Sequence, residues 1–473
     1  MKKEQKRALS LDAFRGYSIL TMVLSSGIVF GVLPAWMYHA QEGPRSNYLF
    51  EESFYGITWV DLVFPFFLFA MGAAFPFSIG SKLEKGMSRR QVLKDILLRF
   101  FRLIVFAVVC QHLYPFFISS PQNVHSWLMA LVGFGLLFPM FMRFPAQWPK
   151  RIQLSVRTIA YAVMLWMLLT ATYANGKPFS LYDSNIILLV LANMALFGSL
   201  IYMATINHRL CRIAILPILM GLMLGSKSEA SWNHIVFEFT PVGWAYKMVY
   251  LKYLFIVIPG MFAGDFLKDW LQSLQVNDKE ATDDRNIYVV SLAIVPVLLM
   301  VLNLYGLYTR SLLFNLNGTI ILLALLWRLL PHVGGENHKL WSRLFWAGAY
   351  LLLLGLVFEA YEGGVRKSSS TYSYYFITSG LAFLLFITFT IVCDIYHCKW
   401  ITLPLGYAGQ NPMIAYVSTQ LLVMPVLNLT GLAALMKYFE QNAWLGFMQG
   451  VILTAAALLV TAFFTKRRCF WRT

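Results

Sequence analysis

Asp61 is a carboxylate inside a segment, residues 56–69, that is otherwise apolar enough to enter a membrane. A charge at the centre of a spanning helix costs at least about 2.5–3.5 kcal/mol on insertion scales, so it needs a partner or a task. His39 is the candidate partner. The apolar stretch that begins near Gly16 reaches the far face after about 20 residues, close to Trp36, and Asp61 lies about one turn inside the next span. We therefore expect His39 and Asp61 at similar depth on a helical hairpin.

A histidine beside a buried carboxylate can do acid–base or nucleophilic chemistry. The carboxylate fixes the tautomer of the imidazole and stabilises its cationic form. His39 would then be a general base, or a nucleophile that carries an acyl group. The alternative is an interfacial histidine in an aromatic belt, with Asp61 bonded to backbone groups freed by Pro65. The spacing of these residues leaves both interpretations open.

Further polar residues lie at the opposite ends of the apolar stretches. Asp12 and Arg15 can share a helix face, and Arg99 and Arg102 repeat the same spacing. Guanidinium groups bind phosphate oxygens bidentately, so these arginines could hold a phosphorylated ligand. Helix capping, chain orientation and snorkelling are the simpler uses. Asn411 precedes a proline within an apolar stretch, where irregular backbone is tolerated only if it is buried or lines a cavity.

The composition is that of a polytopic membrane protein. Of 473 residues, 59% are hydrophobic and 13% are charged, and the mean hydropathy is +0.63. Soluble domains carry about 25% charged residues. A net charge of +16 would suggest a nucleic-acid partner for a soluble protein. We expect no nucleic acid here, because basic residues gather in cytoplasmic loops and orient the chain.

The sequence predicts an all-α bundle of about 12–14 transmembrane helices, each of roughly 20 residues. Most of the 38 Lys and Arg residues fall in alternate loops, which predicts that both termini are cytoplasmic. A single membrane domain would cover residues 1–473, with motif-bearing helices in 1–142, variable helices in 143–250 and C-terminal helices in 251–473. The GxxxG spacing of residues 260–264 predicts close helix packing. The candidate spans lie near 16–36, 57–79, 96–118, 125–142, 156–174, 184–204, 210–226, 250–267, 286–306, 311–330, 344–360, 374–394, 403–426 and 444–465.

Two residues in a predicted outside loop oppose the orientation bias. Arg366 and Lys367 suggest an anionic substrate, or an ion pair with Glu359 or Glu362. An ordinary solvated loop is the alternative.

The five cysteines give no disulfide framework, because an odd number lies in or beside apolar stretches. Cys393, His397 and Cys398 have the look of metal ligands, but structural zinc sites favour tighter ligand pairs and four ligands. We therefore expect a reduced helix end and no metal.

Four segments resemble the family of heparan-alpha-glucosaminide N-acetyltransferase, a lysosomal transmembrane enzyme, and its bacterial relatives. These segments are residues 10–16, residues 56–69, the loop and span that begin at Val365, and residues 409–412. The stretch 33–41 resembles the bacterial subgroup found in gut-type Bacteroidetes. The resemblance covers the N-terminal third of the chain well and the C-terminal third loosely.

The resemblance implies an acetyltransferase of the bacterial inner membrane, working as a homodimer among membrane lipids. Acetyl-CoA would dock from the cytoplasm, and a histidine near the far face, His39 with Asp61, would pass the acetyl group to an amino sugar. The donor would bind among Asp12, Arg15, Ser26, Arg99, Arg102 and Asn411. The saccharide acceptor would meet Trp36, Tyr38, Glu51, Glu52, Arg366 and Lys367.

The chain departs from the family pattern at two positions. Glu51, followed by Glu52, stands where the family has its histidine, and His39 comes earlier in the same loop. Either His39 has taken the role through a rearranged loop, or the site uses carboxylate chemistry, or the reaction differs. We favour His39, because aromatic and proline residues would hold its loop in place. Ser26 stands where the family has an asparagine.

Two other functions remain open. A transporter or exporter of a saccharide or lipid-linked sugar would use Asp61 as an ion site and Arg366 as a substrate contact. The internal pseudo-symmetry common in transporters is not evident in the sequence. An O-acetyltransferase of a surface polysaccharide would keep the reaction and change the acceptor.

Overall fold

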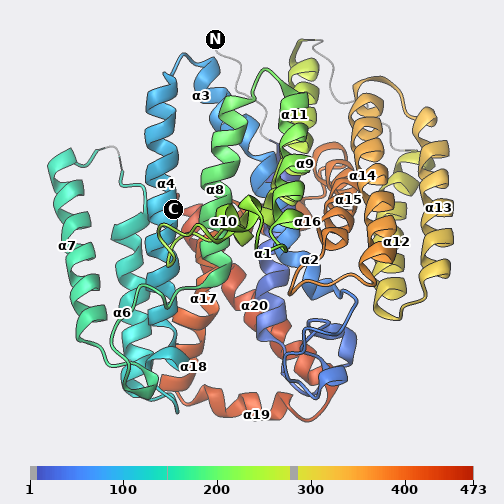
Figure 1. Ribbon diagram of the computed structural model, residues 1–473. Helices are drawn as coiled ribbons and strands as arrows, with labels where there is room; N and C mark the ends of the chain where they lie inside the picture. The colour runs from blue at the N-terminus through green and yellow to red at the C-terminus, as the bar shows by residue number, and fades with distance from the viewer. Residues whose placement is uncertain (1–7, 146, 277–285, 472–473) are drawn as a thin grey trace.

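The computed structural model describes residues 8–145, 147–276 and 286–471, and within these ranges the chain is helical throughout its regular structure (Figure 1). The extended pairing in these ranges is limited to a single bridge between Met142 and Trp471. Eleven helices of the described ranges are long and apolar enough to cross a membrane. The predicted all-α membrane bundle is therefore confirmed.

The helices have the following bounds: α1 Leu9–Gly27, α2 Trp59–Ala73, α3 Ser81–Glu84, α4 Arg89–Leu113, α5 Pro115–Ile118, α6 Val124–Phe141, α7 Lys150–Thr170, α8 Ile186–Ala204, α9 Arg209–Gly225, α10 Trp232–Glu238, α11 Leu254–Val276, α12 Ile287–Tyr308, α13 Leu312–Leu329, α14 Gly335–Glu362, α15 Tyr372–Phe389, α16 Lys399–Gln410, α17 Pro412–Ser418, α18 Met424–Leu429, α19 Met436–Phe439 and α20 Ala443–Lys466. The eleven candidate spans are fewer than the 12–14 predicted. Helices α1 and α4 carry charged residues toward their N-terminal ends and fall outside the eleven, and α9 has 17 residues, short for a full crossing.

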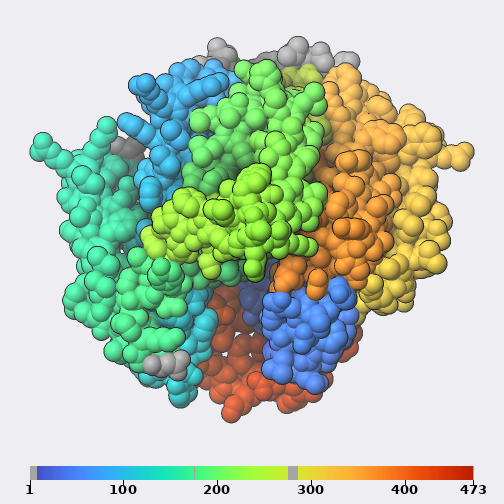
Figure 2. All heavy atoms as spheres, in the orientation of Figure 1, coloured from blue at the N-terminus to red at the C-terminus, as the bar shows by residue number. Residues whose placement is uncertain are grey.

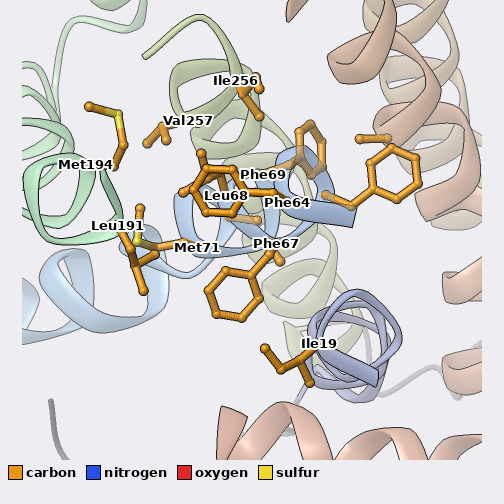
Figure 3. Packing of buried hydrophobic residues seen from close by; sticks show 14 of the residues in the cluster. Ile19, Phe64, Phe67, Leu68, Phe69, Met71, Leu191, Met194, Ile256 and Val257 are labelled. Carbon is orange, nitrogen blue, oxygen red and sulfur yellow. The ribbon is translucent and has the colours of Figure 1, made fainter. Parts of the chain in front are cut away.

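Helices α2 and α15 form the centre of the bundle. The spans that contain them are 83% buried within the protein, whereas the spans containing α7 and α13 are 17% and 22% buried. Figure 1 accordingly shows α7 and α13 at opposite edges. Helix α2 packs against α1, α8 and α11, and Figure 3 shows Phe67 of α2 directed toward Ile19 of α1. Asp61 therefore lies in the first turn of α2, one of the two most deeply buried of the eleven candidate spans.

Glycines let two helix pairs approach at backbone distance. A Cβ placed on Gly260 would meet the carbonyl oxygen of Phe69 at 2.2 Å, and one on Gly264 would meet that of Ala73 at 2.2 Å. The predicted close packing at the GxxxG spacing is confirmed, with α2 as the partner of α11. In the second pair, a Cβ on Gly409 of α16 would lie 1.8 Å from the carbonyl oxygen of Asp12 in α1.

Asn411 divides the predicted span 403–426 into α16 and α17. Its backbone is non-helical, with φ −133° and ψ 54°, and its side chain is buried. The Asn411 amide donates to the Cys469 carbonyl at 2.8 Å, and its oxygen accepts from the Trp471 backbone N–H at 3.2 Å. The predicted irregular backbone is therefore buried, and its polar side chain holds the C-terminal segment.

A buried ion pair joins α9 and α11. Arg212 is fully buried, and its guanidinium lies 2.8 Å from the carboxylate of Asp265. Tyr202 of α8 also donates to that carboxylate at 3.1 Å. Asp265 thus connects three helices.

Candidate active site

The loop between α1 and α2 is folded around Tyr38. The Tyr38 hydroxyl accepts from the backbone N–H groups of Val32 and Leu33 at 3.1 and 2.8 Å, and donates to the Val29 carbonyl at 2.8 Å. Its ring is buried and packs edge-on against Phe30. Tyr38, predicted to stack on a sugar, therefore lies inside the loop and sets the position of the next residue, His39.

Asp61 binds both its own helix and that loop. It is the third residue after Thr58, which precedes α2, and the two form a capping box. Its Oδ2 accepts from the backbone N–H of Thr58 at 2.9 Å and from that of Ala40 at 3.2 Å. Its Oδ1 lies 2.8 Å from Nδ1 of His39. The expected proximity of His39 and Asp61 is observed.

Pro65 has a different effect from the one considered in the sequence. A proline cannot bond the carbonyl of the residue four positions earlier, which here is Asp61. The hydroxyl of Tyr374 in α15 supplies that hydrogen bond, at 2.7 Å. The freed backbone group is thus satisfied from a neighbouring helix, and the Asp61 carboxylate remains available to His39.

Lys367 approaches the same pair from the loop between α14 and α15. Its Nζ lies 2.9 Å from Nδ1 and 3.4 Å from Nε2 of His39, and 3.6 Å from Oδ1 of Asp61. Burial lowers the pKa of the Lys367 ammonium, and the Asp61 and Glu42 carboxylates oppose that shift. The side chains of His39 and Lys367 are 34% and 26% exposed, whereas Asp61 is 2% exposed. The site therefore combines an enclosed carboxylate with an accessible imidazole and amine.

A cavity of about 220 Å³ extends from this group into the bundle. His39, Lys367 and Ser26 all line it, together with apolar residues of α1 and α2 and with Tyr416 of α17. Figure 2 shows the molecular surface hollowed between the loop that follows α1 (blue) and the C-terminal helices (red). Ser26, predicted as a donor contact, is thus brought to the same cavity as the predicted catalytic residues.

The other predicted acceptor contacts are exposed residues of the loop between α1 and α2. Trp36 is 56% exposed, and Glu51 and Glu52 are exposed as well. Glu52 accepts from the hydroxyl of Ser369, the residue two positions beyond Lys367. Trp36 lines a separate apolar cavity between α2 and α12, so of these residues Glu52 is the one that contacts the Lys367 loop.

Arg366 does not make the ion pair considered in the sequence. Its guanidinium lies over the ring of Tyr55 at 4.9 Å, while Glu359 pairs with Arg310 at 2.9 Å. Glu362 accepts from the first backbone N–H groups of α15. The anionic partners proposed for Arg366 are therefore used elsewhere.

The residues predicted to bind the acetyl donor do not all lie together. Arg15 lies 3.7 Å from Asp12 and donates to the Gly409 carbonyl at 3.2 Å. Asp12 lines a cavity of about 650 Å³ with Lys399 and Tyr407. Arg99 is exposed on α4, within electrostatic range of Arg15. Asp12, Arg15 and Arg99 thus share one end of the bundle.

Arg102 and Asn411 stand apart from that cavity. Arg102 is half-buried on α4, and Asn411 is occupied by the C-terminal segment. Neither residue lines the cavity beside Asp12.

Sequence reasoning missed several features of the site. It named Lys367 as a substrate contact and did not place it beside His39. The capping box of Thr58 and Asp61 could have been predicted from the sequence. A threonine followed three positions later by an acidic residue, at the start of an apolar run, is typical of a helix N-terminus. No sequence pattern indicates the hydrogen bond from Tyr374 to the Asp61 carbonyl. In the described part of the chain, no group of three or more His, Cys, Asp or Glu residues could hold a metal ion.

Residues 7–267 match the family model described as "Domain of unknown function (DUF5009)", which covers more than half of the chain. The chain belongs to this family. The matched region runs from α1 through most of α11, so it contains His39 and Asp61 but not Lys367.

The DUF5009 protein is also similar to curated relatives in mammals. It is 33% identical over 103 residues to heparan-alpha-glucosaminide N-acetyltransferase of Homo sapiens and of Mus musculus. The matched region is 22% of this chain, and it spans 13% and 14% of the two relatives. The resemblance found in the sequence is therefore confirmed as a distant relationship, within a multi-pass membrane protein.

Proposed function

We propose that this protein is a transmembrane acetyltransferase that moves an acetyl group from acetyl-CoA to a saccharide on the far side. The contact between His39 Nδ1 and Asp61 Oδ1 at 2.8 Å is the observation that carries the proposal. An Nδ1–H donated to the carboxylate leaves the lone pair on Nε2 free, which is the arrangement of a nucleophile or general base. The distant relatives support the reaction class.

The two ends of the bundle suit different parts of this reaction. The larger cavity beside Asp12 has Lys399 in its wall, and Arg15 and Arg99 lie near, so this end suits a phosphorylated donor. The smaller cavity at His39 is enclosed mainly by apolar side chains, so it suits the acyl end of a thioester. Passing an acetyl group alone avoids carrying the charged nucleotide through hydrocarbon.

In this mechanism the His39 Nε2 lone pair attacks the acyl carbon of the thioester, and the carbon–sulfur bond breaks. The C–S electron pair leaves with the thiolate, and Asp61 balances the positive charge on the acylated imidazole. An acceptor amine then attacks the same carbon, the bond to Nε2 breaks, and the freed imidazole takes the proton of the amine. The acceptor would enter past Trp36, Glu51 and Glu52.

The proposed location combines two arguments. Most of the 38 Lys and Arg residues fall in alternate loops, so we place both termini in the cytoplasm. The resemblance to bacterial relatives suggests a bacterial inner membrane. His39 would then face the periplasm. A homodimer is part of the proposal by family analogy.

The test uses the purified full chain with radiolabelled acetyl-CoA and glucosamine. We expect the parent to transfer label to the sugar, and His39→Ala to abolish transfer. His125→Ala is the matched control, since His125 is an exposed histidine at the start of α6 and lies outside the His39 cavity. Undiminished transfer by His39→Ala would remove the proposed centre. CoA-dependent thermal stabilisation separates this enzyme from a transporter, which should show none.

A further inference from the structure

Lys367 is held beside His39 by a loop that is fixed at several points. The Gln41 amide side chain accepts from the Ser368 backbone N–H at 2.9 Å and donates to the Ser368 carbonyl at 3.4 Å. The Val365 carbonyl accepts from the Gly56 backbone N–H at 2.8 Å, and the Val365 side chain is fully buried. These bonds tie the Lys367 loop to Gln41, two positions after His39, and to Gly56 near the end of the same loop, so its amine is positioned before any ligand arrives.

The position of the amine relative to the imidazole defines its use. When Nδ1 of His39 donates its proton to Asp61, Nδ1 cannot also accept from Lys367. Nε2 then carries the lone pair, and the Lys367 Nζ lies 3.4 Å from it, a long contact for a hydrogen bond. When that lone pair attacks a carbonyl carbon, the contact is released, and the ammonium has an N–H group to donate to another acceptor.

A group bonded to Nε2 would provide that acceptor. A carbonyl carbon attacked by Nε2 carries its oxygen within hydrogen-bonding reach of a donor placed 3.4 Å from Nε2. That oxygen becomes negative as the bond forms, and a pre-positioned donor stabilises it most in an enclosed site. Asp61, 3.6 Å away, favours the charged form of the amine.

We propose that Lys367 is a catalytic residue that donates to the oxyanion formed when His39 is acylated. The proposal rests on the proposed acyl transfer. Attack by Nε2 forms the nitrogen–carbon bond and moves the carbonyl electron pair onto oxygen, where Lys367 holds it. Return of that pair expels the leaving group with the electrons of its bond to carbon. The same donor serves the second oxyanion, when the acceptor attacks.

The experiment measures acylation of the purified full chain by p-nitrophenyl acetate, which needs neither the natural donor nor the acceptor. We expect a nitrophenolate burst in the parent that His39→Ala abolishes. Lys367→Met should slow the burst by about 10²–10³-fold, the loss typical of an oxyanion donor, and Lys367→Arg should restore most of it. Lys247→Met, an exposed lysine of another outer loop, should leave the burst unchanged. Thermal melting of each variant checks folding.

The outcomes separate this inference from the proposed function. A burst that depends on His39 but changes by less than about threefold in Lys367→Met overturns the role of Lys367. A parent with no burst, or with a burst that survives His39→Ala, overturns it too, since nothing then forms at Nε2. A burst that needs both residues, in a protein that moves no label from acetyl-CoA to glucosamine, upholds Lys367 and rejects the proposed substrates.

Discussion

The Tyr374 hydroxyl donates a 2.7 Å hydrogen bond to the backbone carbonyl of Asp61. Both groups are buried, and Pro65 has removed the intrahelical partner of that carbonyl. The bond therefore ties the first turn of α2, and with it the Asp61 carboxylate, to α15.

Tyr374→Phe should leave the buried carbonyl without a donor. Such a group costs about 1–3 kcal/mol, so the free energy of unfolding should fall by that amount. Acyl transfer should fall too, because the Asp61 backbone is no longer fixed. Thermal unfolding in detergent and the burst assay measure the two effects. Tyr361→Phe is the control, since Tyr361 is 84% exposed. A fully stable Tyr374→Phe protein would mean that the bond contributes nothing.

Asp61→Asn should separate the two tasks of this residue. The amide keeps an acceptor for the backbone N–H of Thr58 or Ala40, so much of the helix cap survives. It cannot balance an imidazolium or hold the same tautomer of His39, so the transfer rate should drop by about 10²–10⁴-fold. Steady-state transfer and melting temperature, measured together, test this. Equal loss of both would assign Asp61 a structural role alone.

The proposed role of Lys367 predicts an alkaline limit to activity. The protonated amine is the active form, so the contribution of Lys367 is lost as pH rises through its pKa in the folded protein. Burial lowers this pKa, against the opposing charges of Asp61 and Glu42, so the fall should come at lower pH than for a free lysine.

Unfolding does not explain such a fall. Across that window the unfolded chain binds more protons at Lys367 than the folded chain, so this group makes stability rise with pH. Burst rates recorded against pH should therefore fall while the melting temperature holds. Lys367→Arg should move the limit to higher pH, because arginine stays charged. The same limit in Lys367→Met would assign it to another group.

Gly409→Ala should disrupt the contact between α16 and α1. The added Cβ would meet the Asp12 carbonyl oxygen at 1.8 Å, and backbone cannot give way as a flexible side chain can. We expect a loss of at least about 1–3 kcal/mol in the free energy of unfolding. Gly135→Ala on α6 is the matched control, since nothing lies within 4 Å of its added Cβ. Equal melting temperatures for the two variants would contradict the packing described.

The sequence by itself determined the class of fold and predicted that His39 and Asp61 lie at a similar depth. Hydropathy and length identify spans because each helix satisfies its own backbone, and a hairpin of known helix rise brings its ends to a common depth. The GxxxG spacing and the break at Asn411 were readable for the same reason, since both are local features of the chain.

The tertiary structure alone decided what completes the site. Lys367 reaches His39 across 328 positions, Tyr374 replaces the bond that Pro65 removes, and Arg212 finds Asp265 on another helix. The direction in which one helix faces another depends on packing between distant segments, which no local periodicity encodes. Tyr38 and Asn411 show the same limit in reverse. Both were predicted as ligand contacts, and in the structure both side chains are buried and bond to backbone groups.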